Sequence, residues 1–285
     1  MAHLKSTGEF ERTVFVFLSD NGPEGSDYAQ ADLWLRFNYN RDLERLGGPG
    51  AYVVPGPSWS SASASPLSSF KFYAGEGGIR SPLIISGAAG AQANQIHAGL
   101  THVTDIVPTL LDLAQLPNPG GRYQGRPIEA QTGRSLVAAL ANPATQVRRG
   151  DEALGYELAG NKALFKGQLK LVLNNPPVGD GQWHLYDLST DPGETQDLQK
   201  TLPAQFTALQ ADYAAWAQSN GVLSMPDGYN PINQVVINSF VNYWWPVYWP
   251  QLVAAALLLL LLFLLLLLGL PIALWRRARR RRVKP

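Results

Sequence analysis

Hydrophobic side chains form two short continuous runs in the first part of the chain. Thr13–Ser19 reads TVFVFLS and Pro82–Ser86 reads PLIIS, and neither run alternates strictly between apolar and polar positions. Runs of β-branched and aromatic residues without alternation are typical of strands that are buried on both faces of a mainly parallel sheet. In residues 104–116 the apolar positions recur at helical spacing, and Pro108 suits the first turn of a helix. Residues 1–150 are therefore predicted to form an α/β domain whose mainly parallel sheet is incomplete here.

The segment between these two runs has a different character. Residues 28–69 are rich in Trp, Tyr, Gly, Pro and Ser, and only residues 41–46 look helical. The serine-rich part, residues 58–69, is low in complexity. The whole segment predicts a long ordered loop, of the kind that often carries function in a compact domain.

The pattern changes again near residue 151. Four short segments rich in strand-forming residues are separated by turn residues, at 153–158, 162–166, 169–173 and 183–188. This spacing predicts a small antiparallel sheet. Residues 203–219 follow as an amphipathic helix with four large apolar side chains on one face, namely Phe206, Leu209, Tyr213 and Trp216. Residues 151–221 are therefore assigned to a small antiparallel-sheet subdomain.

Near the carboxyl terminus, residues 252–274 carry no charge. As a helix they would extend about 34 Å, which exceeds the roughly 30 Å of a hydrocarbon core. Aromatic residues flank this stretch, as expected at bilayer interfaces. We predict a transmembrane helix at 252–274, preceded by a linker with an aromatic belt at 222–251 and followed by a basic cytoplasmic tail at 275–285.

Charge is distributed unevenly along the chain. The net charge is +1, but six Arg and one Lys lie after Trp275, so the rest of the chain has 16 basic and 22 acidic residues. No basic surface is indicated upstream of the tail, which argues against a nucleic-acid partner and leaves the lipid bilayer as the partner of the tail. The chain has no Cys, and disulfides are therefore excluded.

Two candidate metal ligands, Asp20 and Asn21, directly follow the first predicted strand. Ligands of open α/β sheets collect at the carboxyl ends of strands. Carboxylate and amide oxygens suit Ca²⁺ or Mg²⁺. On its own, however, Asp-Asn-Gly is also a common β-turn sequence.

An ordered series of segments resembles the type I sulfatases, and most closely their bacterial arylsulfatase branch. The series consists of FLSDNG, the Trp/Tyr/Gly loop, Lys71 before GEGGIRSP, THVTDIVPTLLDLA and WHLYDLSTDPGETQDL, and it covers about residues 1–221. The resemblance implies an alkaline-phosphatase-like α/β fold with a small carboxy-terminal antiparallel sheet. It also implies hydrolysis of sulfate esters.

Three residues receive roles from this resemblance. Asp20 and Asn21 match the second pair of calcium ligands of the family, and Lys71 matches the lysine that contacts the sulfate oxygens. A lysine ammonium there would neutralise charge on the sulfate and on the departing oxygen. The loop 76–80 is interpreted as structural, with glycines that allow close approach and Arg80 paired with backbone or carboxylate.

Other titratable residues are given structural interpretations or none. His102 and Asp105 stand at a predicted helix start and are interpreted as capping residues. Asp187, Asp191 and Glu194 are interpreted as turn carboxylates. The remaining histidines considered, His3, His97 and His184, have no partners at metal-ligand spacing and are assigned no role.

Part of the family's machinery has no counterpart in this sequence. The resemblance implies a formylglycine nucleophile made within Cys/Ser-x-Pro-x-Arg, and this motif does not occur here. The first two calcium carboxylates of the family also have no counterpart. We therefore expect a fragment of a membrane-anchored sulfatase that is inactive alone. Its catalytic part would be extracytoplasmic and its carboxyl terminus cytoplasmic, because seven positive charges do not readily cross a bilayer.

Two alternatives stay open at this point. The first is a phosphate or phosphonate ester hydrolase of the same superfamily, against which Asn21 speaks, because the two-metal phosphatases tend to use His among their ligands. The second is a non-catalytic, membrane-tethered remnant of a sulfatase. The sequence carries no signal for the natural substrate or the oligomeric state.

Overall fold

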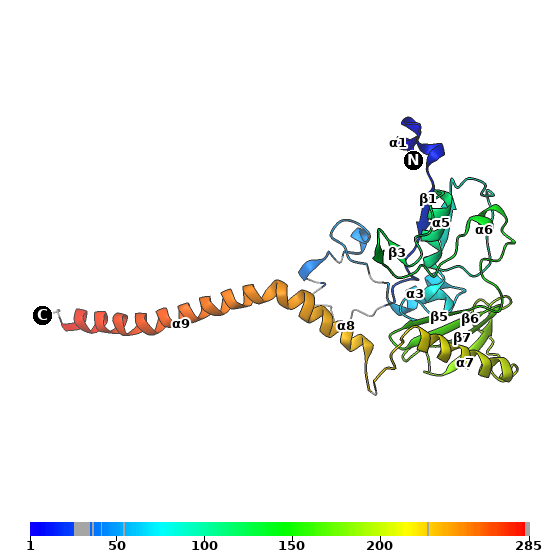
Figure 1. The fold of residues 1–285 in the computed structure, drawn as a ribbon. Coiled ribbons are helices and arrows are strands. Elements are labelled where there is room, and N and C mark those ends of the chain that lie inside the picture. The colour runs from blue at the N-terminus through cyan, green and yellow to red at the C-terminus, as the bar shows by residue number, and fades with distance from the viewer. Residues whose placement is uncertain (26–34, 36, 41, 54, 227, 283–285) are drawn as a thin grey trace. The chain divides into compact units, whose positions relative to one another are not determined.

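The computed structural model describes all residues except 26–34, 36, 41, 54, 227 and 283–285. Contacts divide the chain into two compact units, Met1–Ser224 and Met225–Pro285 (Figure 1). Each unit is described by itself.

The first unit begins with the short helix α1 (Ala2–Ser6), a 3₁₀ turn (Phe10–Arg12) and strand β1 (Phe15–Leu18). Strand β1 pairs with β2 (Leu83–Ser86) in antiparallel register, so that Phe15 lies opposite Ser86. The two strands were correctly located, but the prediction of parallel pairing and burial on both faces is wrong for this pair. Phe17 and Ile84 are 64% and 59% exposed. An apolar run without alternation does not encode strand direction, because direction depends on the path of the connection between the strands.

The predicted long loop contains more helix than expected. Helix α3 (Gly56–Ala64) occupies much of the serine-rich stretch that was predicted as loop, and this prediction is corrected. Its serines and alanines are compatible with a helix, and Ser60 is buried and donates a hydrogen bond to the Glu24 carbonyl oxygen, 2.6 Å away. The predicted helical patch is a 3₁₀ turn at Leu43–Arg45. Other parts of the predicted loop, including Arg41, lie outside the described residues.

The next segment confirms the predicted helix near residue 104. A 3₁₀ turn (Val103–Asp105) leads into α5 (Ile106–Leu113), and Pro108 stands in its first turn. The other elements of this part of the chain are short: α4 (Glu76–Ile79), β3 (Arg122–Tyr123), β4 (Arg126–Pro127) and α6 (Val137–Ala141). The β3–β4 hairpin is exposed.

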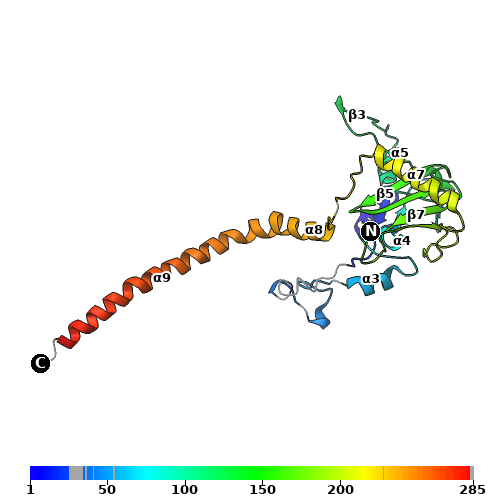
Figure 2. The same cartoon turned by 90° about the horizontal axis from the view of Figure 1, so that it is seen from below.

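The predicted antiparallel sheet is confirmed. Its strands follow one another in sequence order: β5 (Ala153–Leu158), β6 (Asn161–Lys166), β7 (Leu169–Leu173) and β8 (Trp183–Asp187). Helix α7 (Pro203–Ser219) has the predicted bounds and covers one face of the sheet (Figures 1 and 2). On that face, Leu209 and Tyr213 of the helix pack against Leu164, Leu171 and Leu185 of the strands.

The opposite face of this sheet is covered by an earlier part of the chain. Ala163, Phe165 and Val172 form a buried cluster with Ala74. Leu164 faces the helix while its neighbours in β6 face Ala74, which is the alternation expected for successive residues of a strand. The segment around Ala74 is therefore part of the core of the sheet subdomain.

The second unit is helical over most of its length. Helix α8 (Pro231–Ser239) leads through a π-helical turn (Phe240–Trp244) into α9 (Trp245–Arg282), which continues through Pro250 and Pro271. Much of the predicted linker 222–251 is thus helix. One stretch of this helical region, Asn233–Leu267, has a mean hydropathy of 2.7 over its most apolar part, and is long and apolar enough to cross a membrane. It begins earlier than the predicted span 252–274.

Candidate active site

The site is built on the turn that follows β1. The Ser19 N–H donates to the Pro82 carbonyl oxygen at 3.3 Å, and the Gly22 N–H donates to the Gly78 carbonyl oxygen at 3.0 Å. A Cβ atom at position 22 would collide with the carbonyl oxygen of Gly77. A residue larger than glycine therefore could not hold the turn this close to the 76–80 loop. In that loop, a Cβ atom at Gly77 or Gly78 would also collide with backbone carbonyl oxygens, as expected for glycines that allow close approach.

Lys71 lies against the same turn. Its backbone N–H donates to the Pro23 carbonyl oxygen at 3.0 Å, and its ammonium lies 2.9 Å from Glu24 Oε2. The hydrogen bond that Lys71 donates to the Glu24 carboxylate raises the pKa of Lys71 above its ordinary value despite partial burial, and the charges of Glu24 and Asp20 add to the effect. The structure therefore brings Lys71 and Asp20 within electrostatic reach of each other, and it keeps Lys71 positively charged.

Asp20 and Asn21 present oxygen atoms at the start of the turn. Asp20 is exposed, and the Asn21 amide nitrogen donates to the Gly22 carbonyl oxygen at 2.8 Å. Among the residues that the structure describes, no hydrogen bond or ion pair engages the Asp20 carboxylate or Asn21 Oδ1. Two hard oxygen donors without partners fit part of the shell of a Ca²⁺ ion. Within the same described part of the chain, no group of three or more His, Cys, Asp or Glu residues could hold a metal.

Sequence reasoning missed Glu24, because DNGPEG gives no sign that a glutamate four residues after an aspartate would reach a lysine 47 positions further on. The two residues meet because the turn after β1 and the segment before α4 are held side by side by backbone hydrogen bonds.

The 76–80 loop is anchored by a buried cluster of charges. Lys170 Nζ lies 2.8 Å from Glu76 Oε1 and 2.8 Å from Glu194 Oε1, and the lysine side chain is fully buried. Arg80 pairs with Glu76 at 3.6 Å, which confirms the predicted pairing with a carboxylate. Glu194 was predicted to be a turn carboxylate, and this prediction is wrong. Its side chain is 3% exposed and also accepts hydrogen bonds from the Ser68 hydroxyl and the Glu76 N–H.

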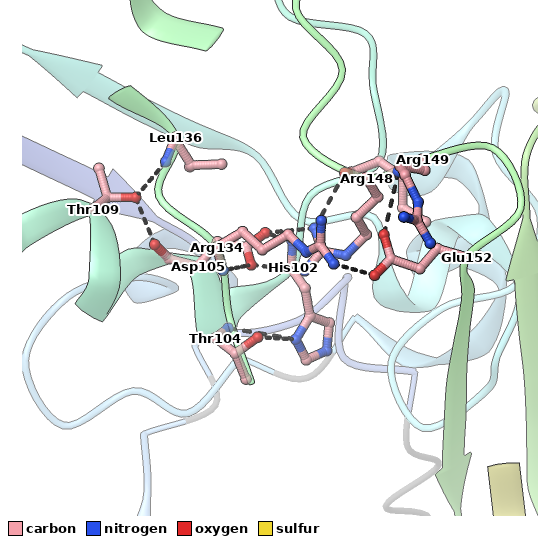
Figure 3. A network of polar contacts seen from close by, with 10 residues as sticks. His102, Thr104, Asp105, Thr109, Arg134, Leu136, Arg148, Arg149 and Glu152 are labelled. Carbon is pink, nitrogen blue, oxygen red and sulfur yellow. Dashed lines mark hydrogen bonds and ion pairs between the residues drawn. The ribbon is translucent and has the colours of Figure 1, made fainter. Parts of the chain in front are cut away.

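A second buried cluster surrounds Asp105 (Figure 3). Asp105 accepts a hydrogen bond from the His102 N–H at 2.8 Å, and His102 Nδ1 accepts from the Thr104 N–H at 3.4 Å, which confirms that both residues cap the 3₁₀ turn that leads into α5. Arg148 adds a bidentate ion pair, with both N–O distances at 2.7 Å. Burial alone would raise the pKa of Asp105, but the hydrogen bonds from Arg148 and from backbone N–H groups outweigh it and hold that pKa below its ordinary value. These contacts favour a structural role.

His184 was assigned no role from the sequence, yet it lies between two carboxylates. Its Nδ1 is 2.7 Å from Asp197 Oδ2 and its Nε2 is 3.0 Å from Asp180 Oδ1. Burial lowers the pKa of His184, but the two carboxylates outweigh burial and raise it above its ordinary value. The histidine lines a cavity of about 320 Å³ together with residues such as Ser69 and Tyr186. The turn interpretation is confirmed for Asp187 and Asp191, which accept hydrogen bonds from the N–H groups of residues 189 and 195.

Comparison with known proteins decides the family. Residues 1–116, which contain Asp20, Asn21 and Lys71, match the sulfatase family model. This part of the chain belongs to the sulfatase family. The sulfatase match covers both the turn after β1 and the 76–80 loop, and extends past the end of helix α5.

Curated relatives extend the sulfatase assignment beyond residue 116. An uncharacterized sulfatase of Schizosaccharomyces pombe (strain 972) is 32% identical over 232 residues, which are 80% of this chain and 42% of that protein. The arylsulfatase of Klebsiella aerogenes is 32% identical over 143 residues, which are 48% of this chain and 30% of that protein. The chain therefore spans less than half the length of either sulfatase relative.

A solved structure supports the fold. The crystal structure of Ps i-CgsB in complex with k-i-k-neocarrahexaose superposes with a TM-score of 0.52 at 20% sequence identity, and covers 76% of this chain and 39% of that one. The mixed helix and strand architecture with a small antiparallel sheet is thus shared with a known fold.

Proposed function

We propose that this chain is the carboxy-terminal part of an arylsulfatase-like hydrolase of sulfate esters, anchored to a membrane by its apolar helix. The observation that carries the proposal is Lys71, a cation held on the backbone of the turn that presents Asp20 and Asn21. A cation next to hard oxygen donors can bind a divalent anionic group together with a metal ion. The family match of residues 1–116 supports sulfate as that group.

In this proposal Asp20 and Asn21 hold a calcium ion through their side-chain oxygens. The ion would supply a positive charge for the sulfate oxygens. Further ligands and the formylglycine nucleophile would come from sequence outside this chain, in keeping with the absence of Cys/Ser-x-Pro-x-Arg and of a complete acidic cluster in the described residues. The chain alone would then be inactive.

Lys71 would neutralise charge on the sulfate and on the departing oxygen. Its ammonium pairs with Glu24, and both side chains are partly exposed, at 43% and 35%. A sulfate oxygen could therefore reach the ammonium without the desolvation of a buried pair. The phosphate or phosphonate alternative is less favoured, because the turn offers the Asn21 amide where two-metal phosphatases tend to place His.

In a full-length sulfatase that contains this chain, we expect Lys71→Ala to lower kcat/KM about 10²–10³-fold, since the variant loses a charged contact in the transition state. Calcium content, measured by metal analysis, should not change. Lys71→Arg should rescue poorly, because a planar guanidinium does not replace a compact ammonium. Asp20→Ala should lower calcium affinity and turnover together.

The matched control for Lys71→Ala is Lys5→Ala, which removes a lysine from the short first helix, away from the turn. It should keep wild-type kinetics. If Lys71→Ala keeps full activity and Asp20→Ala keeps full calcium, the residues are surface and turn positions, and the site assignment fails. Activity on a phosphate ester with none on an aryl sulfate would favour the alternative hydrolase.

Membrane orientation follows from the charged tail. We expect the carboxyl terminus to lie in the cytoplasm and the catalytic part outside it, because basic residues flanking a span are retained on the cytoplasmic side. A reporter that is active only in the cytoplasm should therefore be active when it is fused after Pro285. A fusion that is active only outside the cytoplasm would contradict this orientation, and replacing the six arginines by glutamine should weaken it.

A further inference from the structure

The backbone around Lys71 adopts an unusual conformation. Ser69 and Phe72 have φ angles of 66° and 87°, in the left-handed region that residues other than glycine rarely occupy. Such residues persist only where surrounding contacts hold them, and they cluster at functional sites. Two of them within four residues, on either side of Lys71, indicate that this segment is held in place from outside.

The contacts that hold it come from the carboxy-terminal sheet. Asn161, the first residue of β6, is fully buried, and its Nδ2 donates to the Phe72 carbonyl oxygen at 3.0 Å. Asn174, just after β7, accepts a hydrogen bond from the Ala74 N–H at 2.7 Å. Both bonds fall within three residues of Lys71, on its carboxyl side.

The ends of the segment are fixed by the same subdomain. Glu194 accepts hydrogen bonds from the Ser68 hydroxyl at one end and from the Glu76 N–H at the other, the latter at 2.8 Å. Lys170 of β7 neutralises both Glu194 and Glu76. Residues 68–76 are therefore tied to the sheet subdomain by four hydrogen bonds and by the Lys170–Glu76 ion pair, and Lys71 lies between the first and the last of these contacts.

We propose that the carboxy-terminal sheet sets the position of Lys71, with Asn161 and Asn174 as positioning residues that act through the backbone of residues 72–74. In this proposal the sheet subdomain positions the Lys71 ammonium in addition to burying the hydrophobic core. The significance of this for catalysis rests on the proposed role of Lys71 in sulfate binding. The sheet also helps to position the turn with Asp20, because the Pro23 carbonyl oxygen of this turn accepts a hydrogen bond from the Lys71 N–H.

Two pairs of variants of the full chain in detergent test this inference by amide hydrogen exchange. Asn174→Leu removes the acceptor of the Ala74 N–H, whereas the conservative Asn174→Asp keeps it. Asn161→Asp keeps the acceptor that binds the Asn175 N–H but loses the donor to Phe72. We expect Asn174→Leu and Asn161→Asp to speed exchange at the amides of residues 71 and 74 about tenfold, which corresponds to the loss of one hydrogen bond. Asn174→Asp should exchange like the wild type.

The amides of β6 and β7 serve as the internal reference. Faster exchange confined to residues 71–76 supports the inference. Unchanged exchange at residues 71 and 74, or an equal increase throughout β6 and β7, would overturn it, because the asparagines would then have no effect on the segment or would only stabilise the sheet. Asn174 is partly exposed, so its variants should fold even if Asn161→Asp does not.

Titration with inorganic sulfate separates this inference from the proposed function. If Lys71→Met weakens sulfate binding, the two positioning variants should weaken it too, while Asn174→Asp should not. Wild-type sulfate affinity in both positioning variants would then overturn the inference. If Lys71→Met itself keeps wild-type sulfate affinity, the proposed function is wrong, and hydrogen exchange alone decides whether the sheet holds the segment.

Discussion

Replacing Lys170 by methionine should lower the free energy of unfolding by about 3–5 kcal/mol at neutral pH, because removing one partner of a buried ion pair leaves an uncompensated charge. In this case two carboxylates, Glu76 and Glu194, lose their shared cation, and both side chains are at most 5% exposed. Arg80 lies 3.6 Å from Glu76 and can compensate only one of them. Chemical unfolding of the full chain in a mild detergent, followed by tryptophan fluorescence, measures the loss.

Lys166→Met is the matched control. Lys166 lies at the end of the neighbouring strand β6 and pairs with Asp212 at 2.7 Å, but both side chains are 34% exposed. Exposed ion pairs contribute roughly 0–1 kcal/mol, so this variant should be nearly as stable as the wild type. If both variants lost the same free energy of unfolding, the burial of Lys170 would not explain the effect that we assign to it.

The second large effect is expected at Arg148. Its side chain is 9% exposed and binds a fully buried Asp105 (Figure 3). Arg148→Met should therefore destabilise the fold by about 3–5 kcal/mol at neutral pH, measured in the same unfolding assay. Arg149→Met is the control, since Arg149 is 76% exposed and pairs with an exposed Asp151. It should change stability by less than about 1 kcal/mol.

The pH dependence of these two variants provides a further check. Because the pKa of Asp105 is lowered in the folded chain, its stabilising effect is complete above the ordinary aspartate pKa of about 3.9 and is lost as the pH falls through the folded value. The difference between the wild type and Arg148→Met should therefore shrink below about pH 4. A difference that stays constant from pH 7 to pH 3 would contradict the assignment of this energy to the Asp105 carboxylate.

Regular elements with local signals could be predicted from the sequence. The bounds of helix α7 and of the four strands β5–β8 follow from apolar periodicity and from turn residues, and both signals are local in the sequence. The direction of the β1–β2 pair could not be predicted in this way, since 64 residues separate the strands. Helix α3 was missed because serine and alanine are compatible with both helix and loop, and the contact of Ser60 with Glu24 is not visible locally.

The candidate site shows the same division. Asp20, Asn21 and Lys71 were selected by their resemblance to a known series of segments, and the structure places Lys71 on the turn that bears the other two. Charged groups that stabilise the surroundings were missed or misinterpreted. In the sequence, Lys170 resembles any surface lysine and Glu194 resembles a turn residue. Their roles become visible only in the fold, where Lys170 binds both Glu194 and Glu76, which lies 94 positions before Lys170.

The sequential order of the strands β5–β6–β7–β8 has a consequence for how the protein assembles. Each strand pairs with its neighbour along the chain, so the sheet can form quickly from local contacts, without waiting for distant parts of the polypeptide. The segment that contains Lys71 can reach its final conformation only after this sheet exists, since Asn161, Asn174 and Glu194 hold it there. During synthesis, which proceeds from the amino terminus, Lys71 therefore reaches its final position only after the ribosome has made most of the sheet subdomain.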